Sequence, residues 1–204
     1  MKRLPRLTGL CCLVLLGATP AGAQEGGAPP VPKRKFDYGT KIEVVYEKKK
    51  DYTTVFMNWY RVTEEPKEPD VYRRTRPPEI SIRAGFGYAG RVMKSTPPAV
   101  DFHINAEYEG DSYFRGKEMP ELIAVVDGER ISLGKPVLTR SKTTLGVVGP
   151  GQVTIEGLGA SFTYQGLLRL VNAGKVSMSV GRMGFELKER HLEALRDLAS
   201  RMVP

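Results

Sequence analysis

Hydrophobic and polar residues alternate along much of the chain beyond residue 37, and this period of two predicts β-strands. The clearest example is "VDFHINAEYEG" at 100–110, where apolar or aromatic residues take every second position and polar residues lie between them. A strand of this kind buries one face and exposes the other to water. The inward-facing residues are then Val100, Phe102, Ile104, Ala106 and Tyr108, and the outward-facing residues are Asp101, His103, Asn105, Glu107 and Glu109.

Further segments carry the same pattern. "KIEVVYE" at 41–47 places Ile42, Val44 and Tyr46 on one face, and "EISIRAGFGYAG" at 79–90 alternates similarly. "LIAVVDGERISL" at 122–133 indicates a hairpin, because Asp-Gly suits a type I′ turn between two β-rich runs. The remaining strand segments are "YTTVFMNWYRV" at 52–62, interpreted as one long strand, "QVTIEG" at 152–157 and "KVSMSVG" at 175–181. The four prolines of residues 63–78 predict an exposed loop.

The period changes in the last forty residues. "TYQGLLRLVNAG" at 163–174 has helical spacing and ends at Gly174, which we expect to be the C′ residue of a short helix. The tail that follows is a second helix, in which Lys188 stands where a good N-cap residue would be favoured. It therefore needs tertiary packing for its stability. Its apolar stripe consists of Leu192, Leu195, Leu198, Ala199 and Met202.

These patterns together predict a mainly β protein, an antiparallel β-sandwich of about eight or nine strands with two short C-terminal helices. An antiparallel sheet with one apolar face needs a cover, which a second sheet and the two helices can supply. We expect a single sandwich-like domain over 38–204, with the helical tail packed on its core.

The first 23 residues predict a cleaved export signal. Lys2, Arg3 and Arg6 precede the apolar run "LTGLCCLVLLGA", and Ala23 closes a small-x-small cleavage site. The apolar run is too short to span a membrane, and its cysteines lack the small preceding residue that lipid attachment requires. Residues 24–37 are rich in Gly, Pro and charge and predict a flexible tether. The protein is therefore expected to be periplasmic or secreted, with no transmembrane segment after cleavage.

Cleavage at Ala23 would change the composition. The net charge of +8 would fall to +5, and no cysteine would remain for a disulfide framework. Basic clusters at 33–35, 48–50 and 73–76 are then solvated loop charge or contact an anionic surface, such as phospholipid or lipopolysaccharide headgroups. Export argues against nucleic acid as a partner, whereas an envelope protein or a glycan remains an alternative partner.

Several stretches carry a resemblance to a known group of proteins. They are "TTV" at 53–55, "FGYAG" at 86–90, "TPPAVDFHI" at 96–104, "DGERISLG" at 127–134, "LVNAGKVSMSVG" at 170–181 and "FELKERHLEALRDLA" at 185–199. In this order they resemble a widespread group of exported bacterial β-rich proteins with a helical C-terminus. The resemblance implies an export signal and a β-rich domain, and it implies neither a reaction nor site residues.

Most of the motifs that could carry chemistry are better explained as structural or solvent-exposed residues. Gly85, Gly87 and Gly90 match G-x-G-x-x-G, but Pro97 and Pro98 leave no room for the helix that a dinucleotide site needs. The two histidines, His103 and His191, have no histidine or cysteine nearby, so we expect no metal and no cofactor. Glu107, Glu109 and Asp111 share one face of a strand and are interpreted as solvated. The alternatives for these acids are a calcium site or a carboxylate pair for glycoside hydrolysis.

The aromatic residues of 52–60 give the best candidate binding site. Strand alternation places Trp59 on the face of Val55 and Met57, and it places Phe56 and Tyr60 on the other face. Exposed aromatic surface marks contact sites, so Phe56 and Tyr60 are candidate ligand-binding residues for a sugar or a partner. We expect a non-catalytic exported or envelope-associated binding module. The alternatives are a carboxylate-dependent hydrolase using Glu107 and Glu109, and a structural subunit of an envelope assembly.

Overall fold

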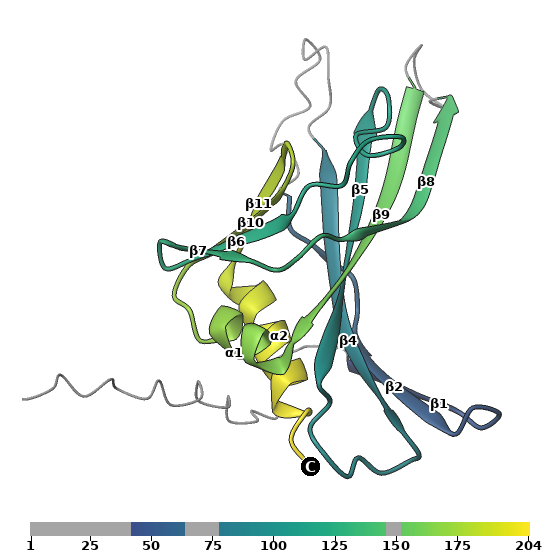
Figure 1. The fold of residues 1–204 in the computed structure, drawn as a ribbon, viewed down its shortest axis with the longest axis vertical. Coiled ribbons are helices and arrows are strands. Elements are labelled where there is room, and N and C mark those ends of the chain that lie inside the picture. The colour runs from purple at the N-terminus through teal and green to yellow at the C-terminus, as the bar shows by residue number, and fades with distance from the viewer. Residues whose placement is uncertain (1–41, 64–77, 146–151) are drawn as a thin grey trace, which may run out of the picture.

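The computed structural model describes residues 42–63, 78–145 and 152–204, which form two antiparallel sheets and two helices (Figure 1). The expected export signal at 1–23, the expected tether at 24–37 and most of the expected loop at 63–78 lie outside these residues. No helix in the described ranges is long and apolar enough to cross a membrane.

The larger sheet, sheet A, has the strand order β1-β2-β4-β5-β9-β8, with the short β3 also paired to β4. All of its pairings are antiparallel. Its strands are β1 (Ile42–Glu47), β2 (Tyr52–Met57), β3 (Tyr60–Arg61), β4 (Glu79–Ala89), β5 (Ala99–Glu109), β8 (Val137–Leu145) and β9 (Gln152–Thr163).

The smaller sheet, sheet B, has the order β11-β10-β6-β7 and is also antiparallel. Asp127 and Gly128 link β6 to β7 with positive φ angles of 49° and 92°, as the predicted type I′ turn requires. The strands of sheet B are β6 (Leu122–Val126), β7 (Glu129–Ser132), β10 (Val176–Val180) and β11 (Met183–Leu187).

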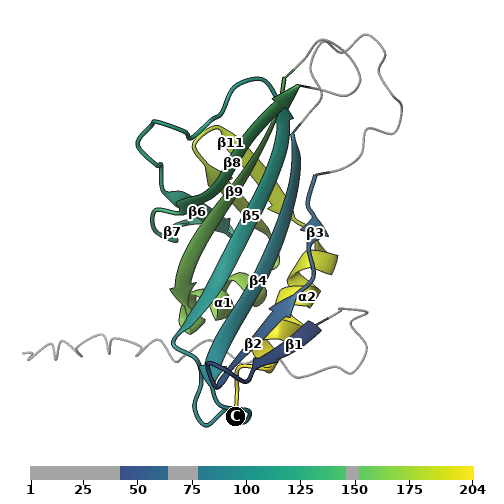
Figure 2. The ribbon, with the colours of Figure 1, turned by 90° about the vertical axis from the view of Figure 1, so that its right-hand side faces the viewer.

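Sheet B and both helices lie on the same side of sheet A, so the fold is the expected sandwich-like arrangement with two C-terminal helices (Figure 1). Helix α1 (Tyr164–Val171) contacts β5, β9 and helix α2 (Glu189–Ser200), and α2 in turn contacts β2, β4 and β11. The opposite face of sheet A has no described layer over it and is seen in front of the helices in Figure 2. We call it the outer face.

The core between the layers is built from the alternating residues. All five residues of β5 that were expected to face inward are buried, whereas Asp101, His103 and Glu109 on the other side are exposed. Every residue of the predicted tail stripe is also buried. The fully buried large side chains of the core include Phe86, Phe102, Met57, Ile80, Ile82, Ile104, Leu122, Leu158, Leu167, Leu168, Leu170 and Met178.

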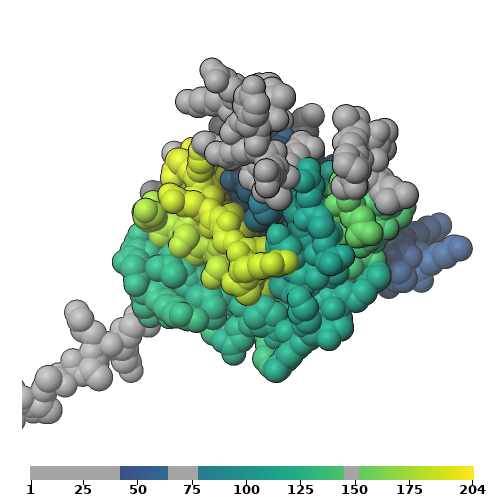
Figure 3. All heavy atoms as spheres, turned by 90° about the horizontal axis from the view of Figure 1, so that it is seen from above, coloured from purple at the N-terminus to yellow at the C-terminus, as the bar shows by residue number. Residues whose placement is uncertain are grey.

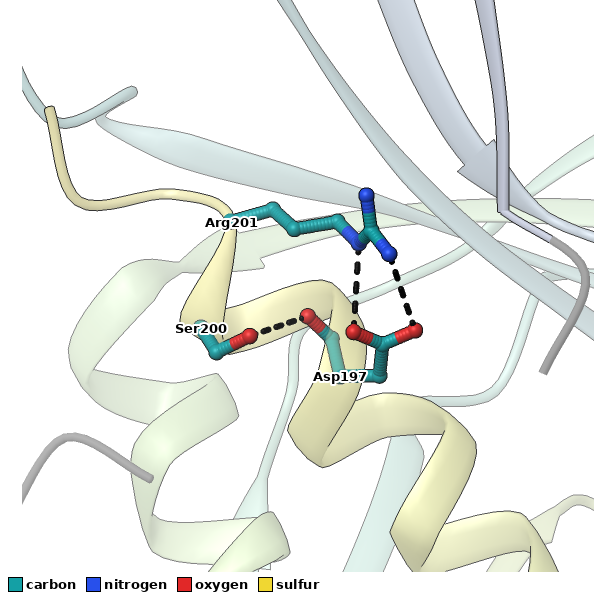
Figure 4. Close-up of polar contacts among 3 residues, drawn as sticks. All are labelled: Asp197, Ser200 and Arg201. Carbon is teal, nitrogen blue, oxygen red and sulfur yellow. Dashed lines mark hydrogen bonds and ion pairs between the residues drawn. The ribbon is translucent and has the colours of Figure 1, made fainter. Parts of the chain in front are cut away.

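Helix α2 ends in a local polar cluster (Figure 4). The Nε of Arg201 donates to one carboxylate oxygen of buried Asp197 over 3.1 Å, and a terminal guanidinium nitrogen donates to the other over 3.4 Å. The hydroxyl of Ser200 donates to the Asp197 carbonyl over 2.7 Å. Arg201 is the C-cap residue of α2, and a cation at this end complements the helix dipole, so Arg201 both pairs the buried carboxylate and stabilises the helix end.

The structure differs from the sequence-based expectation at several elements. The long strand expected over 52–62 breaks at Asn58 and Trp59 into β2 and β3, and β8 and β11 were not predicted, which brings the described strands to eleven. Gly174 is not the C′ residue of the first helix. That helix is capped at Asn172, whose N–H donates to the carbonyls of Leu168 and Leu170. Its start is capped by the side chain of Thr163, which accepts from the N–H of Gly166.

Candidate functional site

On the outer face of sheet A, strand β4 carries glycines at positions where the neighbouring strands carry large side chains. Gly85 and Gly87 of β4 point outward, on the opposite side from buried Phe86, as the sequence predicted. A methyl group at Gly85 would lie 2.8 Å from both the Val55 carbonyl oxygen and the Phe56 Cβ, and one at Gly87 would overlap the Tyr52 ring. The absence of side chains on β4 is therefore what lets the aromatic residues of β2 lie across it.

This geometry leaves a groove between β2 and β5. The groove has a volume of about 290 Å³. Tyr52, Thr54 and Phe56 form its β2 side, and Asp101 and His103 form its β5 side. Arg83 of β4 lines it as well, next to Gly85 and Gly87. We call it the β2–β5 groove.

Side chains of three chemical kinds meet in and beside the β2–β5 groove. The Arg83 guanidinium lies 3.6 Å from the centre of the Phe56 ring and 6.0 Å from the centre of the Trp59 ring, so aromatic faces hold this cation in place. Tyr52 and Trp59 remain 42% and 48% exposed. Asp101 adds a carboxylate acceptor and His103 adds an imidazole ring, and both side chains are exposed to solvent.

The two predicted ligand-binding residues are not brought together, and the prediction that they share a face is wrong. Phe56 pairs with Gly85 on the outer face, whereas Tyr60 pairs with Ile82 on the inner face and packs against the core. The break in the strand at residues 58–59 shifts the alternation by one position. Trp59 is consequently exposed beside Arg83 instead of sharing the buried face of Val55 and Met57.

The carboxylates considered for hydrolysis lie on the same outer face but away from the groove. Glu107 and Glu109 project from β5, as predicted, and neither lines the β2–β5 groove. Asp111 lies beyond the end of β5, where the chain bends, so it does not continue their row. Within the described ranges, no group of three or more His, Cys, Asp or Glu residues is placed to hold a metal ion.

Comparison with known proteins gives no further guide to the site. No family model, curated protein or solved structure matches this chain. The resemblance to exported β-rich proteins therefore stays a prediction, and function has to be argued from the geometry of this molecule.

A buried carboxylate at the far end of sheet A is a polar site that the sequence analysis missed. Glu156 of β9 is fully buried and points to the inner face, between Ala106 and Ser141 on the neighbouring strands. The hydroxyls of Tyr108 and Ser112 donate to its two oxygens. The backbone N–H groups of Tyr113 and Phe114 donate over 3.2 and 3.4 Å. The Glu156 carboxylate thus holds the β5–β6 loop down on the sheet.

An aromatic stack continues outward from this carboxylate. The rings of Tyr108 and Tyr113 lie parallel with centres 3.8 Å apart, and the Arg182 guanidinium lies 3.3 Å above the Tyr113 ring. Burial, followed by the hydrogen bond to Glu156, raises the pKa of the Tyr108 hydroxyl well above its usual value. Tyr108 therefore stays protonated and serves as a donor, which indicates a structural role for the cluster.

His191 supplies the N-terminal cap that α2 lacks at Lys188. Its ring lies at the third helical position, where Nδ1 accepts from the Lys188 N–H over 2.9 Å. The other nitrogen, Nε2, lies 3.1 Å from the Arg61 carbonyl and donates to it in the neutral ring. The buried ring also packs edge-on against Tyr60, with centres 6.3 Å apart. His191 therefore joins the start of α2 to β3.

This geometry predicts that the protein loses stability in mild acid. Burial, and then the charges of Arg190 and Lys188, lower the pKa of His191, and a proton on Nδ1 would face the Lys188 N–H. The unfolded chain takes up this proton below about pH 6.5, before the folded chain does. The contribution of neutral His191 to the free energy of unfolding should therefore be complete above about pH 6.5 and should be lost as the pH drops toward the folded-state pKa. Urea denaturation between about pH 5 and 7.5 would measure this loss.

The matched pair of variants is His191→Gln and His103→Gln. Glutamine at 191 keeps an acceptor for the Lys188 N–H and removes the titration, so its stability should change less with pH. His103 is exposed on the outer face, and its replacement should leave the wild-type dependence intact. Equal pH dependence in wild type and His191→Gln would show that other groups cause the loss.

Proposed function

We propose that this protein is a non-catalytic binding module that holds a glycan in the β2–β5 groove. The observation that carries the proposal is a glycine-floored groove that combines the exposed ring of Tyr52 with the hydrogen-bonding groups of Arg83, Asp101 and His103. A sugar ring presents C–H groups on its face and hydroxyls around its edge. Such a ligand needs this combination of an apolar platform and fixed polar partners.

Each lining residue has a definite role in this proposal. Tyr52 offers its exposed ring to the C–H face of the sugar. Asp101 accepts hydrogen bonds from hydroxyl groups, and Arg83, already held by Phe56, donates without much further loss of conformational freedom. The groove is open to solvent along a sheet face, which suits a segment of a longer glycan. The N-terminal sequence pattern supports the further proposal that the protein meets this glycan after export.

The test is binding of the purified protein to an immobilised oligosaccharide array, followed by titration of the strongest glycan. We expect Tyr52→Ala and Asp101→Asn each to weaken binding about tenfold, which is the effect of losing about 1.4 kcal/mol. Phe56→Ala should also weaken it, because the Arg83 guanidinium loses its support. These residues lie on the outer face, so the melting temperature should change little.

Glu107→Gln is the matched control for Asp101→Asn, because both side chains project from the outer face of β5 and only Asp101 lines the groove. It should bind like wild type. Tyr60→Ala should act differently from Phe56→Ala by lowering the melting temperature, since Tyr60 packs inward. A protein that binds no oligosaccharide, or that binds equally well after Tyr52→Ala and Asp101→Asn, would overturn the proposal.

A further inference from the structure

Two loops meet at the lower end of sheet A in Figure 1, the turn between β1 and β2 and the loop between β4 and β5. Together they carry five basic residues and one strongly exposed aliphatic residue. Figure 3 shows the blue β1–β2 hairpin projecting beyond the rest of the molecule. The surface, which we call the basic tip, consists of Lys48, Lys49, Lys50, Arg91, Val92 and Lys94.

The two loops of the basic tip are fixed to one another. The N–H of Gly90 donates to the Asp51 carbonyl over 2.7 Å, and the Thr53 hydroxyl donates to the Gly90 carbonyl over 2.5 Å. Gly90 has a φ of +78°, which a side chain would disfavour at this crossing. Farther along the same loop, Met93 packs against the core and Pro97 is buried. These hydrogen bonds and buried residues therefore hold the two loops of the basic tip in a fixed arrangement.

Positive charge dominates the basic tip. Its five cations face only two carboxylates in the same loops, Glu47 and Asp51, which leaves a net formal charge of +3. Glu47 is paired with Lys50 over 2.9 Å, and Asp51 accepts from the Tyr46 hydroxyl over 2.9 Å. Lys48, Lys49 and Lys94 make no ion pair within the described part of the chain.

Val92 adds the apolar element. Its side chain is 72% exposed, the highest value among the large hydrophobic residues that the structure describes. The anchors on both sides of it, Gly90 and Met93, hold the loop so that Val92 points away from the core. A hollow of about 520 Å³ lies beside it, lined in part by Asp51, Tyr88, Arg91 and Lys94.

We propose that the basic tip binds the surface of a membrane that contains anionic phospholipid. Lipid phosphates attract clustered Lys and Arg side chains, and an exposed aliphatic residue among them enters the interface. The charge of the tip complements such a surface, and Val92 is free to enter it because most of its surface is exposed. This inference rests on loops outside the β2–β5 groove, so it does not depend on the glycan proposal.

The test is co-sedimentation of the full chain with phosphatidylcholine vesicles that contain or lack phosphatidylglycerol. Wild type should bind the anionic vesicles more strongly, and this preference should vanish as salt rises from about 0.05 M to about 0.5 M, where the Debye length is much shorter. Each lysine removed, as in Lys49→Ser, should weaken binding about fivefold. Val92→Ser should weaken binding to anionic vesicles while keeping the salt dependence.

Lys142→Ser is the matched control, because Lys142 is an exposed lysine on β8, at the other edge of sheet A. It should leave the preference for anionic vesicles unchanged. Since all variants share the rest of the chain, any attachment through other segments cancels in the comparison. Equal binding to both kinds of vesicle, or a preference as strong as that of wild type after the triple change Lys48→Ser, Lys49→Ser and Lys50→Ser, would overturn the proposal.

Discussion

Replacing Glu156 with alanine is expected to lower the free energy of unfolding by about 3–4 kcal/mol, because buried donors lose a charged acceptor. One of these donors is the backbone N–H of Phe114, which cannot turn to find another partner, whereas the Tyr113 N–H keeps the Tyr108 hydroxyl as an acceptor over 2.8 Å. The melting temperature should fall by about 10 °C for a protein of this size. Urea denaturation and calorimetry would measure the two quantities.

Two further variants identify the cause. Glu156→Gln should be intermediate, since it keeps one carbonyl oxygen but turns an amide N–H₂ toward fixed donors. Glu107→Ala removes a carboxylate from the outer face and should change stability by no more than about 0.5 kcal/mol. If Glu156→Ala were as mild as Glu107→Ala, the carboxylate would not be what holds the β5–β6 loop.

Leu195→Ala in α2 is expected to cost about 2–4 kcal/mol through lost burial and the cavity left behind. Leu195 is completely buried where the helix packs on sheet A. Thermal and urea unfolding of the full chain would measure the loss. This experiment asks whether the helical tail is part of the core or an appendage.

Glu193→Ala is the matched change on the same helix, because Glu193 is only partly buried and alanine is a good helix former. It should alter stability by less than about 0.5 kcal/mol. A Leu195→Ala variant as stable as Glu193→Ala would mean that α2 contributes little to the fold and would leave its apolar stripe open to another role.

The sequence allowed strand β5 and helix α2 to be predicted in detail because each has one buried face and the expected period. Strand β9 shows why the same reasoning fails elsewhere. Its apolar residues Val153 and Ile155 face outward, while Thr154 and Glu156 face inward under the β5–β6 loop. A local pattern cannot reveal that a loop from another part of the chain supplies donors for a buried carboxylate.

Strand β8 was missed for a related reason. Its inward-facing residues Ser141 and Thr143 lie beside this polar cluster, so its sequence shows no apolar alternation. The candidate site was predicted only in part. Phe56 was placed correctly on the outer face, but Tyr60 and Trp59 were each assigned to the wrong face. The reason is that a two-residue break in a strand leaves little trace in its composition. The roles of Arg83 and Asp101 depend on pairing between strands, which a single sequence does not show.

The packing of α2 against β2 and β4 has a consequence for how the chain acquires its fold during synthesis. Strands β2 and β4 emerge from the ribosome long before α2 does. Strands β5 and β6 can pair early with β4 and β7, but their second partners, β9 and β10, come much later in the chain. Pairing between such distant segments is slow, and partly formed sheets with uncovered apolar faces tend to aggregate. The nascent chain should therefore keep its apolar sheet face uncovered, and remain a substrate for chaperones, until α2 has been made.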